Sequence, residues 1–379
     1  MNGRPLSVPG GANLRAAWVC FILLACASWA WGDVFNMPAG LTSLEFVTVG
    51  NPGNKGDPRV AVDGTSGYGS VGYEYRIGKF EVTMGQYAEF LNAVAKTDAY
   101  ALYNTGMTDN LGLGYGIVRA GTMGSYTYSV RADWANRPVF RASWADAARF
   151  ANWLTNGQPT GAQDPTTTED GSYLLNGATT DADLMAVVRK PDARYVIPTE
   201  DEWYKAAYHK NDKIDEATTN YFLYPTSSDD KPSNELLNPD PGNNANWSDL
   251  RGDPPTRHLT VDSPYYRSEV GDFENSESPY GTFDQGGNVW EWNEGVYVGS
   301  IGTGRRVRGG CYMDFWFYMA SDYYGAAYPS GESLFMGFRV AETPEPASAG
   351  LMALGAASLF ARRRMAANDP SPRRGMRAR

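Results

Sequence analysis

Glycine and proline interrupt this chain so often that it can form only short helices and strands. Among its 379 residues are 42 glycines and 23 prolines, while charged residues account for 20% and aromatic residues for 13%. A helical bundle or a disordered tail has a different composition. We therefore expect a folded, loop-rich globular protein, which is long enough to bury a substantial core without covalent crosslinks.

Three segments carry the local signature of a helix start. Each begins with Ser or Thr followed three residues later by an acid or amide, the spacing of a capping box. Apolar residues then recur at the spacing that places them on one helix face. We expect short surface helices beginning at Thr83, Ser143 and Thr199, and elsewhere only short strands such as Tyr73 to Phe80.

Residues 1–32 have the pattern of a secretory signal peptide. Arg4 and Arg15 precede an apolar run from Ala16 to Ala30, and small residues follow it. The run is too short, and too soon followed by polar chain, for a convincing membrane span. An alternative is a lipoprotein signal, since Leu23-Leu24-Ala25-Cys26 is a weak lipobox. Both interpretations predict export.

The C-terminal end has a second processing pattern. Pro344-Glu345-Pro346 precedes an apolar stretch from Ala347 to Ala361 and the cluster Arg362-Arg363-Arg364. This order resembles the PEP-CTERM sorting signal of bacterial envelope proteins, which a membrane protease cuts. The stretch has about 15 residues, short of the roughly 20 of a comfortable span. We expect a sorting segment at 344–364, a basic tail at 365–379, transient membrane association, and a secreted or envelope location.

Net charge and cysteine content limit the classes of ligand that the protein can bind and the disulfides that it can form. Residues 1–32 carry two arginines, and residues 347–379 carry seven arginines and one aspartate, so a total of −10 leaves about −18 on the body. An acidic body does not suit nucleic acid, whose phosphates require basic patches, but it suits hard cations. Cys20 and Cys26 lie in the signal segment, so the mature protein keeps Cys311 alone and no internal disulfide is expected.

The segment from Gly281 to Val340 contains the most specific sequence motifs of the chain. It includes GGNVWEW at Gly286–Trp292, RRVRGG at Arg305–Gly310 and GFRV at Gly337–Val340. These motifs resemble the formylglycine-generating enzyme family, also called sulfatase-modifying factor domains.

Three upstream blocks resemble that family in the same order: Ile77 to Tyr87, Arg137 to Leu154 and Ile197 to Trp203. The resemblance implies one domain over residues 33–343. Its expected fold is α+β, irregular and loop-rich, of the sulfatase-modifying factor type related to C-type lectins.

The family's reaction depends on residues that differ here. Its members oxidise a sulfatase cysteine to formylglycine with copper(I) held between two thiolates, and the matching positions are Asp314 and Met319. A carboxylate and a thioether do not make a two-thiolate copper site, so copper is not expected. Cys311 is a weak catalytic candidate as a lone thiol. The alternative is a small buried residue, as free cysteine commonly is.

Calcium is the metal that the resemblance implies. Ca²⁺ takes oxygen ligands from carboxylates, amides and backbone carbonyls. The family's first site maps onto Asp284, Gly287, Val289 and Glu291. Its second site maps onto Asn246, Trp247, Asp262 and Pro264. The alternative for the acidic residues is a role in turns and hydrogen bonds.

A run of aromatic residues is the remaining clue. Eight of the seventeen residues from Tyr312 to Tyr328 are aromatic, mixed with Ser, Gly and Asp, which is the composition of binding loops. In lectin-fold relatives, including variable proteins of diversity-generating systems, the segment before GFR forms the ligand-binding face. The expected binding residues are Tyr312, Asp314, Trp316, Tyr318, Asp322, Tyr323 and Tyr324.

The aromatic residues divide between core and surface in this interpretation. We expect Phe315 and Phe317 in the core, and Tyr318, Tyr323 and Tyr324 at the surface.

Three functions remain open from the sequence. The first is a non-catalytic binding module for a protein or an extracellular polysaccharide. The second is a sulfatase-modifying oxidoreductase with atypical chemistry at Cys311, and the third is a calcium-stabilised structural matrix protein.

Overall fold

The computed structural model describes residues 44–108, 116–212, 220–252, 254–299 and 302–344. They belong to one unit that spans residues 33–379. The signal segment 1–32, with the lipobox, lies outside the described residues, as do the sorting segment from Glu345 onward and the basic tail. Within the described ranges the longest helix has 12 residues and the longest strand has 10, as the glycine and proline content predicts.

The three helices with predicted starts are confirmed. They are α1 (Met84–Val94), α3 (Trp144–Thr155) and α5 (Glu200–Tyr208), and each begins with a complete capping box. In each box the side chain at the cap accepts from the backbone three residues on, and that residue's side chain accepts from the cap's backbone N–H. The shorter helices are α2 (Ala132–Ala135), α4 (Asp181–Ala186) and the 3₁₀ turns η1 (Thr105–Thr108) and η2 (Trp316–Met319).

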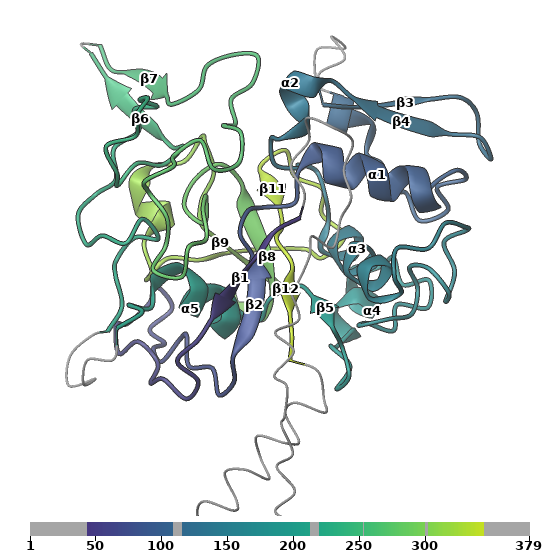
Figure 1. Ribbon diagram of the computed structural model, residues 1–379, viewed down its shortest axis with the longest axis horizontal. Helices are drawn as coiled ribbons and strands as arrows, with labels where there is room; N and C mark the ends of the chain where they lie inside the picture. The colour runs from purple at the N-terminus through teal and green to yellow at the C-terminus, as the bar shows by residue number, and fades with distance from the viewer. Residues whose placement is uncertain (1–43, 109–115, 213–219, 253, 300–301, 345–379) are drawn as a thin grey trace, which may run out of the picture. The chain divides into compact units, whose positions relative to one another are not determined.

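One antiparallel sheet joins the two ends of the fold. Its order is β1 (Phe46–Val49), β2 (Tyr75–Gly78), β12 (Ala341–Glu342) and β5 (Tyr195–Val196). Ala341 pairs with Ile77 on one side and with Val196 on the other. The last strand is therefore held between early and middle segments of the chain. Figure 1 shows this sheet in the middle, with α1, α3 and α4 on the right and α5 on the left.

The second sheet contains parts of the sequence motifs of the C-terminal half, GGNVWEW, RRVRGG and GFRV. Its order is β10 (Gly325–Ala327), β9 (Gly302–Arg308), β8 (Trp290–Gly299) and β11 (Met336–Gly337), with β11 parallel to β8. Two separate hairpins complete the strands: β3 (Ile117–Ala120) with β4 (Thr127–Val130), and β6 (Ser248–Arg251) with β7 (Thr256–Leu259).

Aromatic side chains fill the core between α1, α3 and the first sheet. The ring of Phe90 on α1 lies 5.3 Å from that of Phe150 and 5.2 Å from that of Trp153, both on α3. Phe338 meets the Phe150 ring edge-on at 5.4 Å. Such pairs add about 0.5–1.5 kcal/mol each beyond the burial of apolar area. The apolar stripes that predicted the helices are thus the surfaces that pack.

A buried ion pair connects the two sheets. Arg339 donates to both carboxylate oxygens of Glu291 at 2.6 Å, and both side chains are fully buried. The same guanidinium donates to the carbonyl of Gly78 at the end of β2 and to that of Phe283. The Trp203 indole of α5 donates to the same carboxylate at 2.7 Å.

We expect Arg339→Met to lower the free energy of unfolding by about 3–5 kcal/mol, because Glu291 would stay buried without its partner. Urea denaturation followed by tryptophan fluorescence measures the change. The matched control is Arg131→Met, which removes an exposed ion pair with Asp133 and should cost less than about 1 kcal/mol. Equal effects of the two substitutions would contradict the role given to Arg339.

Candidate functional site

Five aromatic residues on and around η2 form a continuous group that reaches the surface. We call this group, Phe315, Trp316, Phe317, Tyr318 and Tyr323, the aromatic face. Trp316 and Phe317 are the most exposed, at 36% and 39%, and the other three rings are half-buried. Exposed large aromatic side chains in a group are typical of interaction sites.

The rings of the aromatic face support one another. Phe315 stacks on Phe317 at 5.9 Å, and Phe317 lies 4.5 Å from Tyr318. Tyr318 meets Tyr323 edge-on at 4.6 Å, and Trp290 of β8 contacts both tyrosines from below. Since each ring is held by a neighbour, the face is ordered before any ligand arrives, which lowers the entropy cost of binding.

The expected division of rings between core and surface is wrong in three places. Phe317 is exposed, and Phe315 is only half-buried, because Met319 takes the inward position of this turn against Tyr224 and Trp247. Tyr324 is buried: its hydroxyl donates to Asp63 at 2.8 Å and its ring lies under the Arg306 guanidinium.

Tyr312 is also buried, although it belongs to the expected binding residues. Its ring stacks on Tyr266 at 5.7 Å and lies near the guanidinium of Arg267. Tyr312 and Tyr324 therefore support the fold below the aromatic face and do not present their rings to a ligand.

Asp314 fixes the base of the aromatic face. One carboxylate oxygen accepts from the Trp290 indole at 2.7 Å and from the backbone N–H of Cys311 at 3.1 Å. Asp314 therefore ties the turn after Gly310 to strand β8. Asp322, also expected in the site, is half-exposed and lies near Tyr224, where burial and, after it, this carboxylate raise the pKa of Tyr224 to about 12.

Cys311 is buried and holds its proton. Burial raises the pKa of its thiol well above the ordinary value, and the neighbouring Asp314 carboxylate adds to the rise. The thiolate is the reactive form of cysteine. The site therefore favours the structural interpretation of Cys311 over the catalytic one.

The first expected calcium set is used internally by the fold. Both oxygens of Glu291 are taken by Arg339 and Trp203, as described above, and a carboxylate oxygen of Asp284 accepts from the backbone of Gly271 at 2.7 Å. Gly287 has φ +82°, and a side chain there would meet the carbonyl oxygen of Asn246 at 2.1 Å. Close packing thus accounts for this glycine. Glu291 does not fit a cation ligand here, and calcium at this position stays a prediction.

The second expected set has a donor that does fit. The hairpin β6–β7 brings Asn246 and Trp247 beside the turn that contains Asp262, since the Asn246 amide donates to the carbonyl of Tyr266 at 3.1 Å. The amide oxygen of Asn246 is buried and has no hydrogen-bond partner among the described residues. Asp262 is exposed and Pro264 follows it in the same turn. An amide oxygen without a partner and an exposed carboxylate are both oxygen donors of the kind that Ca²⁺ takes.

Sequence reasoning missed Glu81, which lies beside the first set. Its carboxyl is buried; one oxygen accepts from Asn288 at 3.2 Å and the other has no partner among the described residues. Burial raises the pKa of Glu81 well above the ordinary value, and the charges of Asp284 and Glu291 raise it further. The apolar block around Glu81 gave no sign of this, because Glu81 comes from a segment distant in sequence from Asp284 and Glu291.

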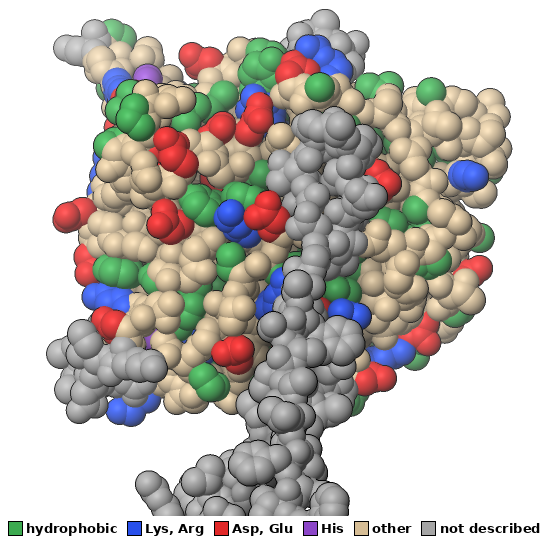
Figure 2. Space-filling view, in the orientation of Figure 1, with side chains coloured by type: hydrophobic (Ala, Val, Ile, Leu, Met, Phe, Trp, Pro, Cys, Tyr) green, Lys and Arg blue, Asp and Glu red, His purple; other side chains and the backbone are tan. Residues whose placement is uncertain are grey.

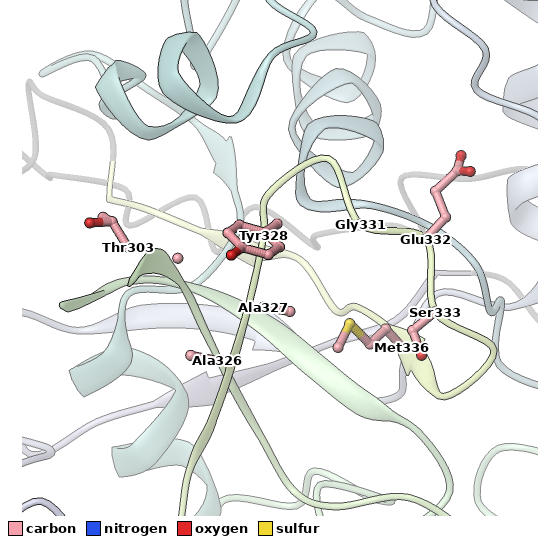
Figure 3. A pocket seen from close by; sticks show the side chains of 9 residues that line it. Thr303, Ala326, Ala327, Tyr328, Gly331, Glu332, Ser333 and Met336 are labelled. Atoms are coloured by element: carbon pink, nitrogen blue, oxygen red, sulfur yellow. The ribbon is translucent and has the colours of Figure 1, made fainter. Parts of the chain in front are cut away.

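Sequence reasoning also missed a cavity of about 430 Å³ beside β9 and β10. Figure 3 shows the Tyr328 ring and the Met336 side chain at the cavity, with Ala327 between them and Ala326 to one side. Glu332 lies at its edge, where burial raises the pKa of that carboxyl and Asn104 donates a hydrogen bond to it. The lining comes from three separate segments. It is mostly apolar and offers few groups that would orient a ligand.

Charged side chains are interspersed on the face of the molecule that Figure 2 shows. The described residues there form no basic patch of the kind that binds phosphate backbones. The exclusion of nucleic acid as a partner stays a prediction. Among the described residues no helix is long and apolar enough to cross a membrane.

Comparison with known proteins identifies two segments. The family model of the sulfatase-modifying factor enzyme 1-like domain matches residues 69–344, and that of the PEP-CTERM protein-sorting motif matches residues 342–364. Both resemblances seen in the sequence are thus confirmed, and with them the α+β, loop-rich, C-type-lectin-like fold of the sulfatase-modifying factor type. No curated protein matches the chain.

Several solved structures are similar to this chain. The crystal structure of CarF shares 19% identity with a TM-score of 0.46, over 80% of this chain and 99% of that chain. Variable protein 1 of Treponema denticola shares 18% with a TM-score of 0.48, over 80% and 96%. PvdO from Pseudomonas aeruginosa shares 17% with a TM-score of 0.42, over 83% and 100%.

The two family matches meet at the last strand of the fold. Glu342 in β12 is buried, and its carboxylate pairs with Arg76 at 2.7 Å and with Arg194 at 3.2 Å. The domain therefore ends where the sorting motif begins. The motif indicates export toward the cell envelope or surface of a bacterium.

Proposed function

The chain belongs to the family of sulfatase-modifying factor enzyme 1-like domains, and we propose that this member is an exported binding module that holds an extracellular ligand on its aromatic face. A sorting protease of the membrane would process the C-terminal segment and leave the domain free or attached at the envelope. The observation that carries the proposal is the pair of exposed rings, Trp316 and Phe317, mounted on an ordered aromatic base.

The surroundings of the face support binding over catalysis. Asp314 and Met319 stand where the resemblance places the family's cysteine pair. The Asp314 carboxylate accepts hydrogen bonds from the Trp290 indole and the Cys311 backbone, and Met319 is buried against Tyr224 and Trp247. Both side chains therefore position the turn, and the exposed rings are the groups that a ligand can reach. Exposed rings supply contact area at a low cost in side-chain entropy.

We expect the double substitution Trp316→Ala, Phe317→Ala to abolish binding of ligands from envelope and matrix extracts, while the thermal midpoint changes by only a few degrees because both rings are partly exposed. Surface plasmon resonance on the immobilised domain measures binding. The matched control is Tyr328→Ala, an exposed ring outside the aromatic face, which should keep the wild-type response. An unchanged response in the double variant would contradict the proposed face.

A second proposal concerns calcium, which would be held at the Asn246–Asp262 turn. The support is the buried amide oxygen of Asn246, which has no partner among the described residues, and the exposed Asp262 carboxylate in the turn whose Tyr266 carbonyl accepts from the Asn246 amide. When bound, the ion would supply charge that cross-links the β6–β7 hairpin to the turn after it. Such a site would stabilise the hairpin next to the aromatic face.

Calcium at 5 mM should raise the thermal midpoint of the wild-type domain by about 2–4 °C over its value in EDTA, as expected for an ion bound in the 0.1–1 mM range. Asp262→Ala should lose this increment and keep the EDTA midpoint, since no hydrogen bond of its carboxylate is described. Differential scanning calorimetry measures both. Asp230→Ala, another exposed acid, serves as the control that keeps the increment; a full increment in Asp262→Ala would refute the site.

The alternative function is a sulfatase-modifying oxidoreductase that uses Cys311. We expect no formylglycine when the protein is incubated with copper, oxygen and a peptide containing Cys-x-Pro-x-Arg, because the Cys311 thiol is buried and its pKa is raised. Mass spectrometry of the peptide measures conversion. Conversion that Cys311→Ser abolishes would establish the enzyme instead of the binding module.

A further inference from the structure

Two cationic side chains flank the aromatic face. The Lys231 ammonium lies 4.7 Å from the centre of the buried Trp247 ring and 6.0 Å from that of the exposed Trp316. The Arg257 guanidinium lies 5.4 Å from the centre of Phe315. Both residues are exposed. Cations within about 6 Å of ring faces are attracted to them, so both charges are held beside the rings.

Neither cation is neutralised by a carboxylate among the residues that the structure describes. Arg257 donates to uncharged acceptors, the Ser248 hydroxyl and the Met313 carbonyl. Asp314 is engaged with Trp290, Asp249 with Arg251 at 3.8 Å and Asp229 with Lys210 at 3.7 Å. The exposed Asp230 precedes Lys231 in the chain and forms no ion pair among the described residues. Both cations therefore lie beside the aromatic face without an ion pair among the described residues, in a chain with a net charge of −10. Positive charge left beside a binding surface attracts an anionic ligand.

The hairpin β6–β7 extends the apolar part of this surface. Leu250 of β6 is paired directly with Arg257 of β7, so the two side chains lie on the same face of the hairpin. Leu250 is exposed. The acid Asp249 precedes it in the strand, and its side chain therefore points to the other side. The flank that meets the rings thus presents an apolar group and a cation.

The exposed rings offer flat apolar surfaces on which sugar rings can stack. With roughly a third of each side chain accessible, Trp316 and Phe317 together present on the order of 150 Å². A sugar ring matches one aromatic side chain in size, and a polymer repeats that contact. Asp322, half-exposed nearby, offers an acceptor for sugar hydroxyl groups.

We propose that the ligand of the aromatic face is an anionic polysaccharide, whose sugar rings stack on Trp316 and Phe317 while its carboxylate or sulfate groups pair with Lys231 and Arg257. This assignment rests on the proposed binding function and specifies its ligand class. The rings supply contact that is independent of charge, and the two cations supply the selectivity for acidic chains.

The test compares hexamers that differ in charge. Calorimetric titration measures the dissociation constants of a galacturonate hexamer, a galactose hexamer, an alginate hexamer and a heparin-derived hexamer at 50 and 300 mM NaCl. We expect at least one anionic hexamer to bind tenfold or more tightly than the galactose hexamer at 50 mM NaCl, and to lose most of that advantage at 300 mM. The double variant Lys231→Gln, Arg257→Gln should lose about tenfold or more for the anionic hexamer and leave galactose binding unchanged.

Controls separate the inference from the proposed function. Lys190→Gln removes a half-buried cation that is paired with Asp170, and it should bind like wild type. Equal binding of charged and neutral hexamers, or a double variant that keeps the discrimination, overturns the anionic assignment alone. Binding of polyglutamate without binding of any hexamer overturns the polysaccharide and leaves the binding module standing. Wild-type affinity in the Trp316→Ala, Phe317→Ala variant overturns both.

Discussion

The Arg339–Glu291 pair is the constraint on which the arrangement of this domain depends. A buried guanidinium needs acceptors for its five donors, and here they come from β8, from the end of β2 and from the turn at Phe283. If any of these hydrogen bonds is not formed, a charge or a polar group stays in the core without a partner, at a cost of several kcal/mol. The two sheets and the turn between them therefore have to form together. The GFRV and WEW motifs, distant in sequence, supply the two partners of this ion pair, Arg339 and Glu291.

The constraint extends from β8 to the aromatic face. Trp290 begins β8, and its indole donates to Asp314, which also accepts from the Cys311 backbone. The turn that carries η2 is thereby attached to the strand that Arg339 holds. At the position where the resemblance places a redox cysteine, a carboxylate closes the turn. Asp314 thus keeps this loop in place through hydrogen bonds from the Trp290 indole and the Cys311 backbone.

Local signals predicted the three longest of the described helices, and long-range contacts decided what the sequence could not show. The capping boxes at Thr83, Ser143 and Thr199 act within one turn, so their residues suffice to predict them. The exposure of Phe317 and the burial of Tyr324 depend on Met319 and on Asp63, which lies far away in the chain. Phe317 and Tyr324 exchange their expected places because hydrogen-bonding and packing partners decide which side chain is buried, and polarity alone does not.

Charge is distributed differently in the core and at the aromatic face. In the core Glu81, Asp284 and Glu291 lie near a single guanidinium, and burial raises the pKa of Glu81 well above the usual range and that of Asp284 to about 7. The raised pKa values of Glu81 and Asp284 favour their protonated forms, which relieves part of this excess of acid. At the surface the imbalance has the opposite sign, since Lys231 and Arg257 stand beside exposed rings without acidic partners among the described residues. In the core, protonation of a carboxyl reduces the excess of negative charge. At the surface, the positive charge beside the rings is complemented best by an anionic ligand.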